Sequence, residues 1–167
     1  TRVDAVLYTH DHADHTHGID DLRSFNYLAD SPIPLYGDAH TMETLQQKYA
    51  YAFGPPPEKI WARPSLIASH FPPGATHSFK VRKTPITAFE QLHGRFKSTG
   101  YRIGDFAYST DVSDLPEAAF ETLEGIKIWV VDCLRYTKSP VHANLEKTLE
   151  WIGRVKPEKA VLTHMAH

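Results

Sequence analysis

Cysteine is almost absent from this chain of 167 residues: Cys133 is the only one, so no disulfide can form within it. Cys133 lies in the apolar run 126–134, and we expect it to pack as a small hydrophobic side chain in a reducing, cytoplasmic environment. No run approaches the roughly 18 apolar residues of a membrane-spanning helix, which argues against a membrane partner. The formal net charge is only -2, and no large basic cluster stands out, which argues against long nucleic acid as a partner.

Histidine, by contrast, is abundant and concentrated: the chain has 11, and four of them fall between positions 10 and 17. Positions 10–15 read His-Asp-His-Ala-Asp-His and follow residues 3–8, a short apolar run typical of a buried strand. Alternate side chains of an extended segment share a face, so His10 and His12 can reach one ion together. A turn after Ala13 would carry Asp14 and His15 toward a second position. The spacing therefore predicts a metal site with room for two adjacent ions.

The ligand types narrow the choice of metal. Neutral imidazole and carboxylate suit zinc or manganese, and also iron, better than ions that prefer thiolates. The alternative is a polar, chelating His/Asp-rich loop without catalysis, but the apolar strand in front of it favours a built site.

The rest of the chain predicts an α/β domain over residues 1–167. Expected strands cover 33–36, 86–92, 99–103, 106–109, 126–131 and 160–162, with a hairpin turn at 104–105. The first expected helix covers 39–51 and follows a cap at Asp38. The second covers 117–123, with Pro116 at its start after Ser113 or Asp114. The third runs from Asn144 to Pro157, and its apolar side consists of Leu145, Leu149, Ile152 and Val155. The proline-rich residues 53–79 predict a long irregular loop near the mouth of the site.

Further candidate ligands share one position: each ends a strand-like run. His93 follows residues 86–92, Asp111 follows 107–110, and His164 follows 161–163. Sites in layered α/β proteins assemble at the carboxyl ends of strands, where loops converge. We therefore expect these three residues to join the histidine-rich segment in one site.

Together, residues 9–15, His93-Gly94, residues 109–111 and residues 162–164 resemble the metallo-β-lactamase fold superfamily of binuclear hydrolases. The branch with the phosphodiesterase for 5-phosphoribosyl 1,2-cyclic phosphate is the most similar, and tRNA 3′-end-processing ribonucleases are related to it. The resemblance runs from Val3 to His167 and implies an αβ/βα four-layer sandwich. Since the motif comes so early, we expect the chain to lack an N-terminal part and a C-terminal tail of that fold.

The resemblance also implies roles for individual residues. One metal would be held by His10, His12 and His93, and a second by Asp14, His15 and His164. Asp111 would bridge both ions. His142 matches a catalytic histidine of the cyclic-phosphate enzyme. The candidate catalytic residues are Asp14 and His142. The β-lactamases proper lack this histidine and often use a cysteine ligand where Asp111 stands, which favours phosphate-ester chemistry.

Physical reasoning supports these roles. A carboxylate between two dications offsets their repulsion, and a bridging water would become an acidic, hydroxide-forming nucleophile. His142 would then protonate the departing oxygen. We therefore expect a cytoplasmic phosphodiesterase with two divalent ions, zinc or manganese with iron also compatible, that acts on a small cyclic phosphate or nucleotide-like substrate.

Other interpretations stay open at this point. His93 could have a structural role, Asp111 could cap a turn and His142 could simply begin a helix, while the remaining histidines fit surface or supporting positions: His17, His40, His70, His77 and His167. The chain could be a tRNA-processing nuclease, a lactonase or a thioesterase, or a metal- or nucleotide-binding protein without turnover. A homodimer is left open.

Overall fold

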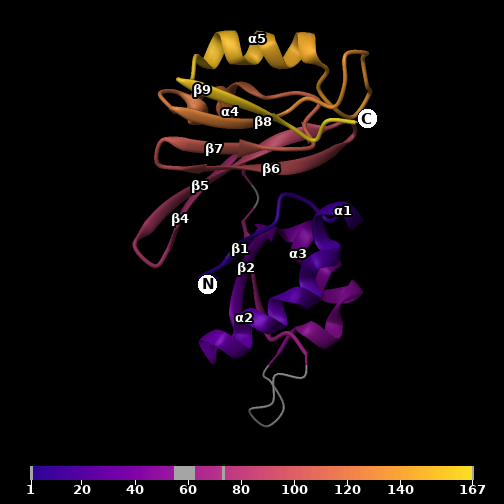
Figure 1. Ribbon diagram of the computed structural model, residues 1–167, viewed down its shortest axis with the longest axis vertical. Helices are drawn as coiled ribbons and strands as arrows, with labels where there is room; N and C mark the ends of the chain where they lie inside the picture. The colour runs from indigo at the N-terminus through magenta and orange to yellow at the C-terminus, as the bar shows by residue number, and fades with distance from the viewer. Residues whose placement is uncertain (1, 55–62, 73, 167) are drawn as a thin grey trace. The chain divides into compact units, whose positions relative to one another are not determined.

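The computed structural model describes residues 2–54, 63–72 and 74–166. The chain divides into two compact units, residues 1–73 (unit 1) and residues 74–167 (unit 2), and each is described by itself (Figure 1). The single domain expected over residues 1–167 stays a prediction. Among the described residues, no helix has the length and apolar character needed to cross a membrane.

Unit 1 is built on a parallel sheet of three strands in the order β1-β2-β3. The strands are β1 (Val6–Leu7), β2 (Ile33–Asp38) and β3 (Leu66–Phe71). The helices are α1 (Ala13–Thr16), α2 (Leu22–Ala29) and α3 (Ala39–Lys48), with 3-10 turns at His17–Asp21 and Ala50–Ala52. Leu35, Met42 and Leu45 are fully buried in its core, so α3 packs its apolar side against the sheet.

Local signals set the start of α3 but not its end. The Asp38 carboxylate accepts a hydrogen bond from the Thr41 backbone N–H at 3.1 Å, which confirms the predicted cap. The helix stops at Lys48 rather than at Tyr51, because the last residues tighten into a 3-10 turn.

The prediction that residues 53–79 form one irregular loop was wrong. Residues 66–71 form β3, which pairs in parallel with β2, and residues 76–81 form the first strand of unit 2. Strand β3 pairs with β2, and helix α3 lies between the two strands in the sequence. A short strand with so distant a partner, in a proline-rich region, shows little strand pattern in its own residues. Residues 55–62 and 73 of the predicted loop lie outside the described residues.

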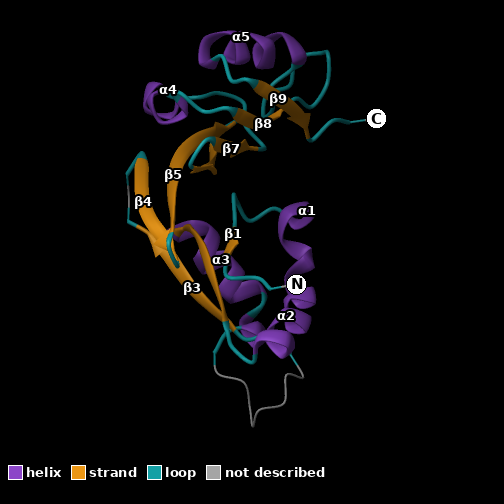
Figure 2. Ribbon diagram, turned by 60° about the vertical axis from the view of Figure 1, so that its left-hand side comes forward, coloured by secondary structure: helices purple, strands orange, loops and turns teal. Residues whose placement is uncertain are grey.

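Unit 2 is built on a sheet of six strands in sequence order, β4 to β9. They are β4 (Thr76–Val81), β5 (Thr84–His93), β6 (Phe96–Ile103), β7 (Phe106–Ser109), β8 (Ile128–Asp132) and β9 (Lys159–Thr163). Strands β4 to β7 are antiparallel neighbours, whereas β7, β8 and β9 are parallel and are connected through α4 (Glu117–Leu123) and α5 (Leu145–Val155). Figure 2 shows these two helices beside the β7–β9 end of the sheet, where Trp129 and Trp151 share one core.

The strands predicted at the positions of β5 to β9 are confirmed, although β8 begins at Ile128 rather than at Ile126. The hairpin turns at residues 104–105, with Ile103 opposite Phe106. Strand β8 is an interior strand between β7 and β9, as its apolar composition predicted.

The helix predictions for unit 2 need two corrections. Pro116 is the N-cap of α4 rather than its first helical residue, and no side chain caps that helix. In α5, Asn144 caps the helix as predicted, but Leu149 is 54% exposed while Thr148 is buried. The reason is that the Thr148 hydroxyl donates to the Asp132 carbonyl at 2.7 Å, which turns the helix so that Thr148 and Trp151 face the sheet.

The strand directions of unit 2 gather four carboxyl ends at one edge of the sheet. Strands β5 and β7 are each antiparallel to β6 and therefore run the same way. Strands β8 and β9 share this direction, because they pair in parallel with β7 and with each other. Residues at the ends of β5, β7, β8 and β9 thus come together.

Candidate metal centre

Unit 1 brings together the four candidate ligands of the histidine-rich segment. His12 is the N-cap of α1, so Asp14 and His15 lie in the first turn of that helix. The rings of His12 and His15 each lie 4.5 Å from the ring of His10, measured between centroids. Nε2 of His15 lies 3.3 Å from Oδ2 of Asp14. The predicted turn after residue 13 is therefore a helical turn.

Neighbouring groups hold this segment in place. The Thr9 hydroxyl lies 3.0 Å from Nδ1 of His10, a contact of the kind that orients a metal-binding imidazole. Lys48, at the end of α3, donates to the backbone carbonyl of Asp11 at 3.2 Å and to its carboxylate at 3.3 Å. Partial burial raises the pKa of the Asp11 carboxyl, but Lys48 outweighs it and the pKa falls below its ordinary value. Asp11 thus stays charged and ties the segment to α3.

Unit 2 groups the three further candidate ligands, with two imidazoles beside the carboxylate of the third. His93 is the last residue of β5, Asp111 follows β7, and His164 follows β9. The Oδ2 atom of Asp111 lies 3.8 Å from Nε2 of His93, and its Oδ1 atom lies 3.3 Å from Nε2 of His164. Both oxygens of Asp111 therefore face imidazole nitrogens.

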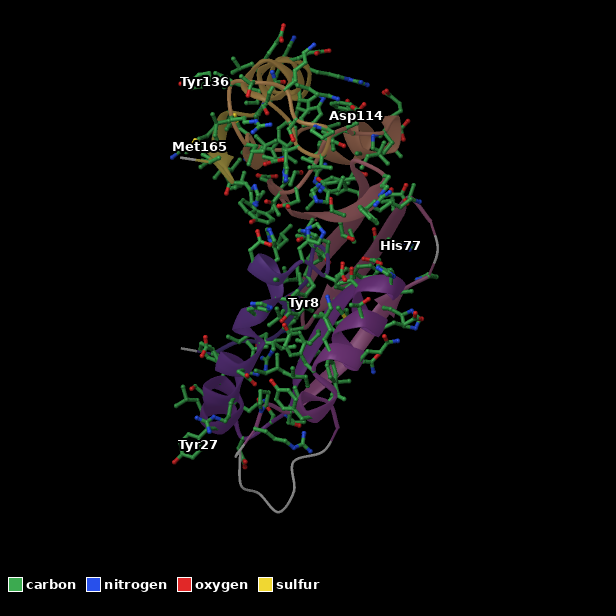
Figure 3. All side chains as sticks on the ribbon, turned by 90° about the vertical axis from the view of Figure 1, so that its right-hand side faces the viewer. Tyr8, Tyr27, His77, Asp114, Tyr136 and Met165 are labelled. Carbon is green, nitrogen blue, oxygen red and sulfur yellow. The ribbon has the colours of Figure 1, made fainter. Side chains whose placement is uncertain are left out.

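The candidate catalytic residue His142 belongs to the same cluster. Its Nε2 atom lies 3.9 Å from Oδ2 of Asp111, and its ring stacks on the ring of His164 at 4.9 Å between centroids. It comes from the segment between β8 and α5, which also carries Tyr136, whose side chain is 84% exposed (Figure 3). The backbone carbonyl of Tyr136 accepts from the Asn144 side chain at 3.2 Å, so the helix cap also orders this segment.

A residue that the sequence reasoning missed is Asp132, the last residue of β8. Its fully buried carboxylate lies 3.1 Å from Nδ1 of His142 through Oδ2, and 3.8 Å from Nδ1 of His164 through Oδ1. Burial raises the pKa of the Asp132 carboxyl, although the Val112 N–H and His142 act in the opposite direction. The sequence does contain a signal for this residue, because Asp132 ends an apolar strand, as His93 does.

Hydrogen bonds select the ring nitrogens that face Asp111. The Val141 carbonyl lies 2.7 Å from Nδ1 of His93 and can only accept, so Nδ1 carries the proton and the lone pair of a neutral ring is on Nε2. The Nδ1 atom of His142 faces the Asp132 carboxylate in the same way. Such partners fix the orientation of metal-binding or proton-transferring imidazoles.

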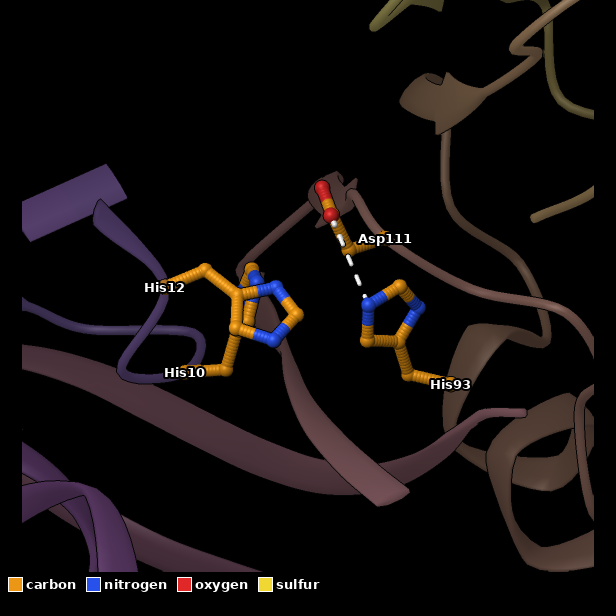
Figure 4. Close-up of side chains that lie close together, drawn as sticks. All are labelled: His10, His12, His93 and Asp111. Atoms are coloured by element: carbon orange, nitrogen blue, oxygen red, sulfur yellow. Dashed lines mark ion pairs between the residues drawn. The ribbon is translucent and has the colours of Figure 1, made fainter. Parts of the chain in front are cut away.

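The donor atoms suit a divalent ion. In unit 2, one ligand atom each from Asp111, His142 and His164 lies within 4.8 Å of the others. Figure 4 draws His10 and His12 of unit 1 and, from unit 2, the His93–Asp111 pair with its dashed line. Imidazole nitrogen and carboxylate oxygen are ligands that zinc and manganese take in proteins. Taken separately, each unit therefore offers donor atoms of the kind that hold a metal ion.

The remaining histidines differ from these. His17, His40 and His70 are exposed, and His77 on β4 is half-buried. None of these four belongs to a group of potential ligands among the described residues. His167 lies outside the described residues.

The fold and these residues define a family. Residues 1–165 match the family described as Beta-lactamase superfamily domain, and the chain belongs to this family. A solved structure described as a new diphosphatase from the PhnP family is 27% identical, with a TM-score of 0.84, over 98% of this chain and 60% of that chain. The resemblance drawn from the motifs is thereby confirmed.

Other relatives agree on the fold. Human tRNase Z, short form, is 14% identical with a TM-score of 0.75, over 98% of this chain and 73% of that chain. Zn2+-bound PqqB from Methylobacterium extorquens is 14% identical with a TM-score of 0.70, over 96% and 62%. These two similarities support the fold alone, and with the family match they confirm the predicted α/β class and the metallo-β-lactamase fold.

A curated relative has another name. The protein called Octanoyltransferase from Porphyromonas gingivalis (strain ATCC BAA-308 / W83) is 30% identical over 166 residues, which are 99% of this chain and 32% of that protein. This chain thus spans about a third of that relative.

Proposed function

We propose that this chain carries the active site of a metal-dependent phosphodiesterase for a small cyclic phosphate or nucleotide-like substrate. The observation that carries the proposal is His142, held by Asp132 at 3.1 Å on Nδ1 and facing Asp111 with Nε2 at 3.9 Å. Membership of the beta-lactamase superfamily and the 27% identity to a PhnP-family diphosphatase support it. In the same proposal the enzyme works in the cytoplasm, where Cys133 stays reduced.

Two divalent ions, zinc or manganese, belong to the proposal. His10, His12 and His93 would hold one, and Asp14, His15 and His164 the other, with Asp111 shared. When bound, the ions would supply an acidified water and would offset charge on the phosphoryl oxygens.

The chain's own residues would then move the proton that the reaction needs. As the water oxygen bonds to phosphorus, the water gives up one proton to the solvent, a P–O ester bond breaks, and the departing oxygen must gain a proton. His142 in its protonated form can donate it from Nε2, because Nδ1 remains bonded to the Asp132 carboxylate, which stabilises the imidazolium. For a cyclic phosphate, the product is a single phosphomonoester.

A polar depression beside His142 supports a hydrophilic substrate. It encloses about 390 Å³ in unit 2, within the usual range for small-molecule sites. Its lining residues are all polar or charged: Ser113, Lys138, Ser139, His142, Asn144, Glu146, Lys147 and Glu150. The acyl chain of a thioester or lactone favours apolar walls, so this lining favours a phosphate ester.

The test uses the purified chain loaded with manganese or zinc and bis(p-nitrophenyl) phosphate or cyclic phosphates as substrates. We expect hydrolysis by the wild type and a fall in kcat of roughly 100- to 10,000-fold in His142→Ala, as for loss of a general acid. Metal content measured by elemental analysis should not change in this variant, because the two proposed ligand sets do not include His142. His40→Ala, which alters an exposed histidine outside the ligand groups, is the matched control and should keep the wild-type kcat.

Three results would contradict the proposal. One is turnover of a lactone or thioester without any phosphodiester hydrolysis. Another is an equal loss of activity in His142→Ala and His40→Ala. A wild type that binds metal and hydrolyses none of these substrates would favour a binding protein without turnover.

A further inference from the structure

We infer that Gln91 and Ser98 are positioning residues, whose buried hydrogen bonds hold the backbone on both sides of Asp111 so that its carboxylate faces the imidazoles of the site. The inference rests on the proposed function, because it assigns both residues to the metal-binding centre. Neither residue touches a candidate ligand's side chain in the contacts described above, so their effect would pass through the backbone of Asp111.

Asp111 has a backbone conformation that needs external support. Its φ is 51°, in the left-handed region that residues other than glycine rarely adopt. Such residues persist only where their surroundings fix the conformation. A residue in the extended conformation would point its side chain elsewhere, so the left-handed backbone and the direction of the carboxylate are linked.

Gln91 and Ser98 supply bonds to both peptide groups of Asp111. They are cross-strand partners on β5 and β6. The Gln91 side-chain nitrogen donates to the Thr110 carbonyl at 3.4 Å and to the Ser98 hydroxyl at 3.2 Å. The Ser98 hydroxyl in turn donates to the Asp111 carbonyl at 2.8 Å.

The direction of these bonds follows from chemistry. A backbone carbonyl can only accept, so the Gln91 nitrogen rather than its oxygen faces Thr110, and the single Ser98 proton goes to Asp111. The two N–H groups of Gln91 and the O–H group of Ser98 are therefore all used on this one turn. Bonds in such a buried chain reinforce each other.

Two further bonds complete the support. The Val112 N–H, in the peptide group that follows Asp111, donates to Oδ2 of Asp132 at 3.1 Å. The Thr110 hydroxyl donates to Oδ1 of Asp111 at 2.9 Å. The turn is thus bonded from β5, β6 and β8 at once.

Burial indicates that the chain maintains this arrangement at a cost. Gln91 is fully buried and Ser98 is 2% exposed. Within the described part of the chain, the Gln91 side-chain oxygen has no hydrogen-bond partner, an unfavourable state for a buried polar atom. An apolar side chain of similar size would avoid that cost, so the presence of glutamine indicates a task for its two N–H groups.

The test measures Co2+ binding by the full chain, through competition with a chromogenic chelator and through the visible absorption spectrum of the bound ion. We expect Ser98→Ala to weaken Co2+ binding by about 10- to 100-fold, as for other groups that support metal ligands, and to change the spectrum. Ser109→Ala is the matched control: the hydroxyl of this fully buried serine accepts from the Trp129 indole N–H at 3.0 Å. Ser109→Ala should bind Co2+ with wild-type affinity and spectrum.

Gln91→Met keeps the side-chain volume and removes the N–H groups. If Ser98→Ala fails to fold, this variant takes its place, and we expect it to weaken Co2+ binding and to change the spectrum in the same way. The inference is overturned if these variants bind Co2+ like the wild type, or if Ser109→Ala loses as much affinity as Ser98→Ala. A wild type that binds no Co2+ overturns the inference and the proposed function together. If the wild type binds Co2+ without phosphodiester hydrolysis and Ser98→Ala binds it weakly, the positioning role stands and the proposed function falls.

Discussion

At the scale of single residues, two of the five non-glycine residues with left-handed backbone among the described residues lie at the carboxyl edge of the unit 2 sheet. Asp111 and His164 have φ angles of 51° and 61°, and both follow directly after strands. Rare backbone conformations cluster at functional sites because the surrounding bonds can maintain them there. Asp132, the last residue of β8, and Cys133, the residue after it, are also buried, and the Cys133 thiol gives a direct probe of this edge.

We predict that Cys133 reacts slowly with thiol reagents in the folded protein. Burial raises the pKa of its thiol, although a hydrogen bond with Thr148 partly offsets this, so less of the reactive thiolate is present at pH 8 than in a free cysteine. Labelling should be at least about 100-fold slower than in the urea-unfolded chain, since it requires local opening. The measurement is the rate of reaction with Ellman's reagent, in which this single cysteine gives the whole signal. A native rate close to the unfolded rate would contradict the burial.

At the scale of elements, two glycines in unit 2 have opposite surroundings. A Cβ atom on Gly100 of β6 would lie 2.4 Å from the Phe89 ring and 2.6 Å from the Gln91 side-chain oxygen. A Cβ atom on Gly153 of α5 would meet nothing within 4 Å. The sheet therefore needs a glycine at position 100, where β5 side chains pass close to the backbone, and α5 does not need one at position 153.

We predict that the same substitution has opposite signs at these sites. Gly100→Ala should lower the free energy of unfolding by about 1–3 kcal/mol through overpacking. Gly153→Ala should raise it by about 0.5–1 kcal/mol, because alanine loses less backbone entropy in a helix. Urea unfolding followed by circular dichroism measures both. A destabilised Gly153→Ala would mean that α5 lacks the open surroundings described here.

At the scale of the whole molecule, each unit has its own apolar core, one around Leu35, Met42 and Leu45 and the other around Trp129, Val131 and Trp151. The candidate metal ligands are divided between the units, with four in unit 1 and three in unit 2 together with His142. A metal ion that binds the folded chain more tightly than the unfolded chain must stabilise the fold.

We therefore predict that zinc or manganese raises the melting temperature and that a chelator reverses the change. At a free ion concentration of 100 times Kd, the stabilisation should be about 2.7 kcal/mol. Differential scanning calorimetry with and without EDTA measures it. His40→Ala should keep the shift and Asp111→Asn should lose most of it, since both Asp111 oxygens face imidazoles. An unchanged melting temperature with saturating zinc would argue against a metal centre.

Local patterns were enough to place the ends of most strands. An apolar run followed by His93, Asp111 or His164 marks the point where a buried strand reaches the sheet edge, and the structure has β5, β7 and β9 ending there. The cap at Asp38 and the hairpin at residues 104–105 are also local, because they depend on a few neighbouring residues.

Neighbouring residues in the sequence did not determine which side of a helix is buried. Leu149 is exposed and Thr148 is buried because the Thr148 hydroxyl donates a hydrogen bond to the Asp132 carbonyl. Asp132 belongs to a strand 16 residues earlier in the sequence. Strand β3 was missed because its partner β2 is distant in sequence. Asp132 carries the strand-end signal, but its role depends on His142 and His164 lying beside it.

The sequence by itself determined the family and the candidate donor atoms, through the spacing of positions 10–15 and the strand-end residues His93, Asp111 and His164. Only the tertiary structure decided which groups support them. The left-handed turn at Asp111 is held by Gln91 and Ser98 from two other strands. Hydrogen bonds between strands depend on register and on side-chain packing, which residue type and spacing along one chain do not specify.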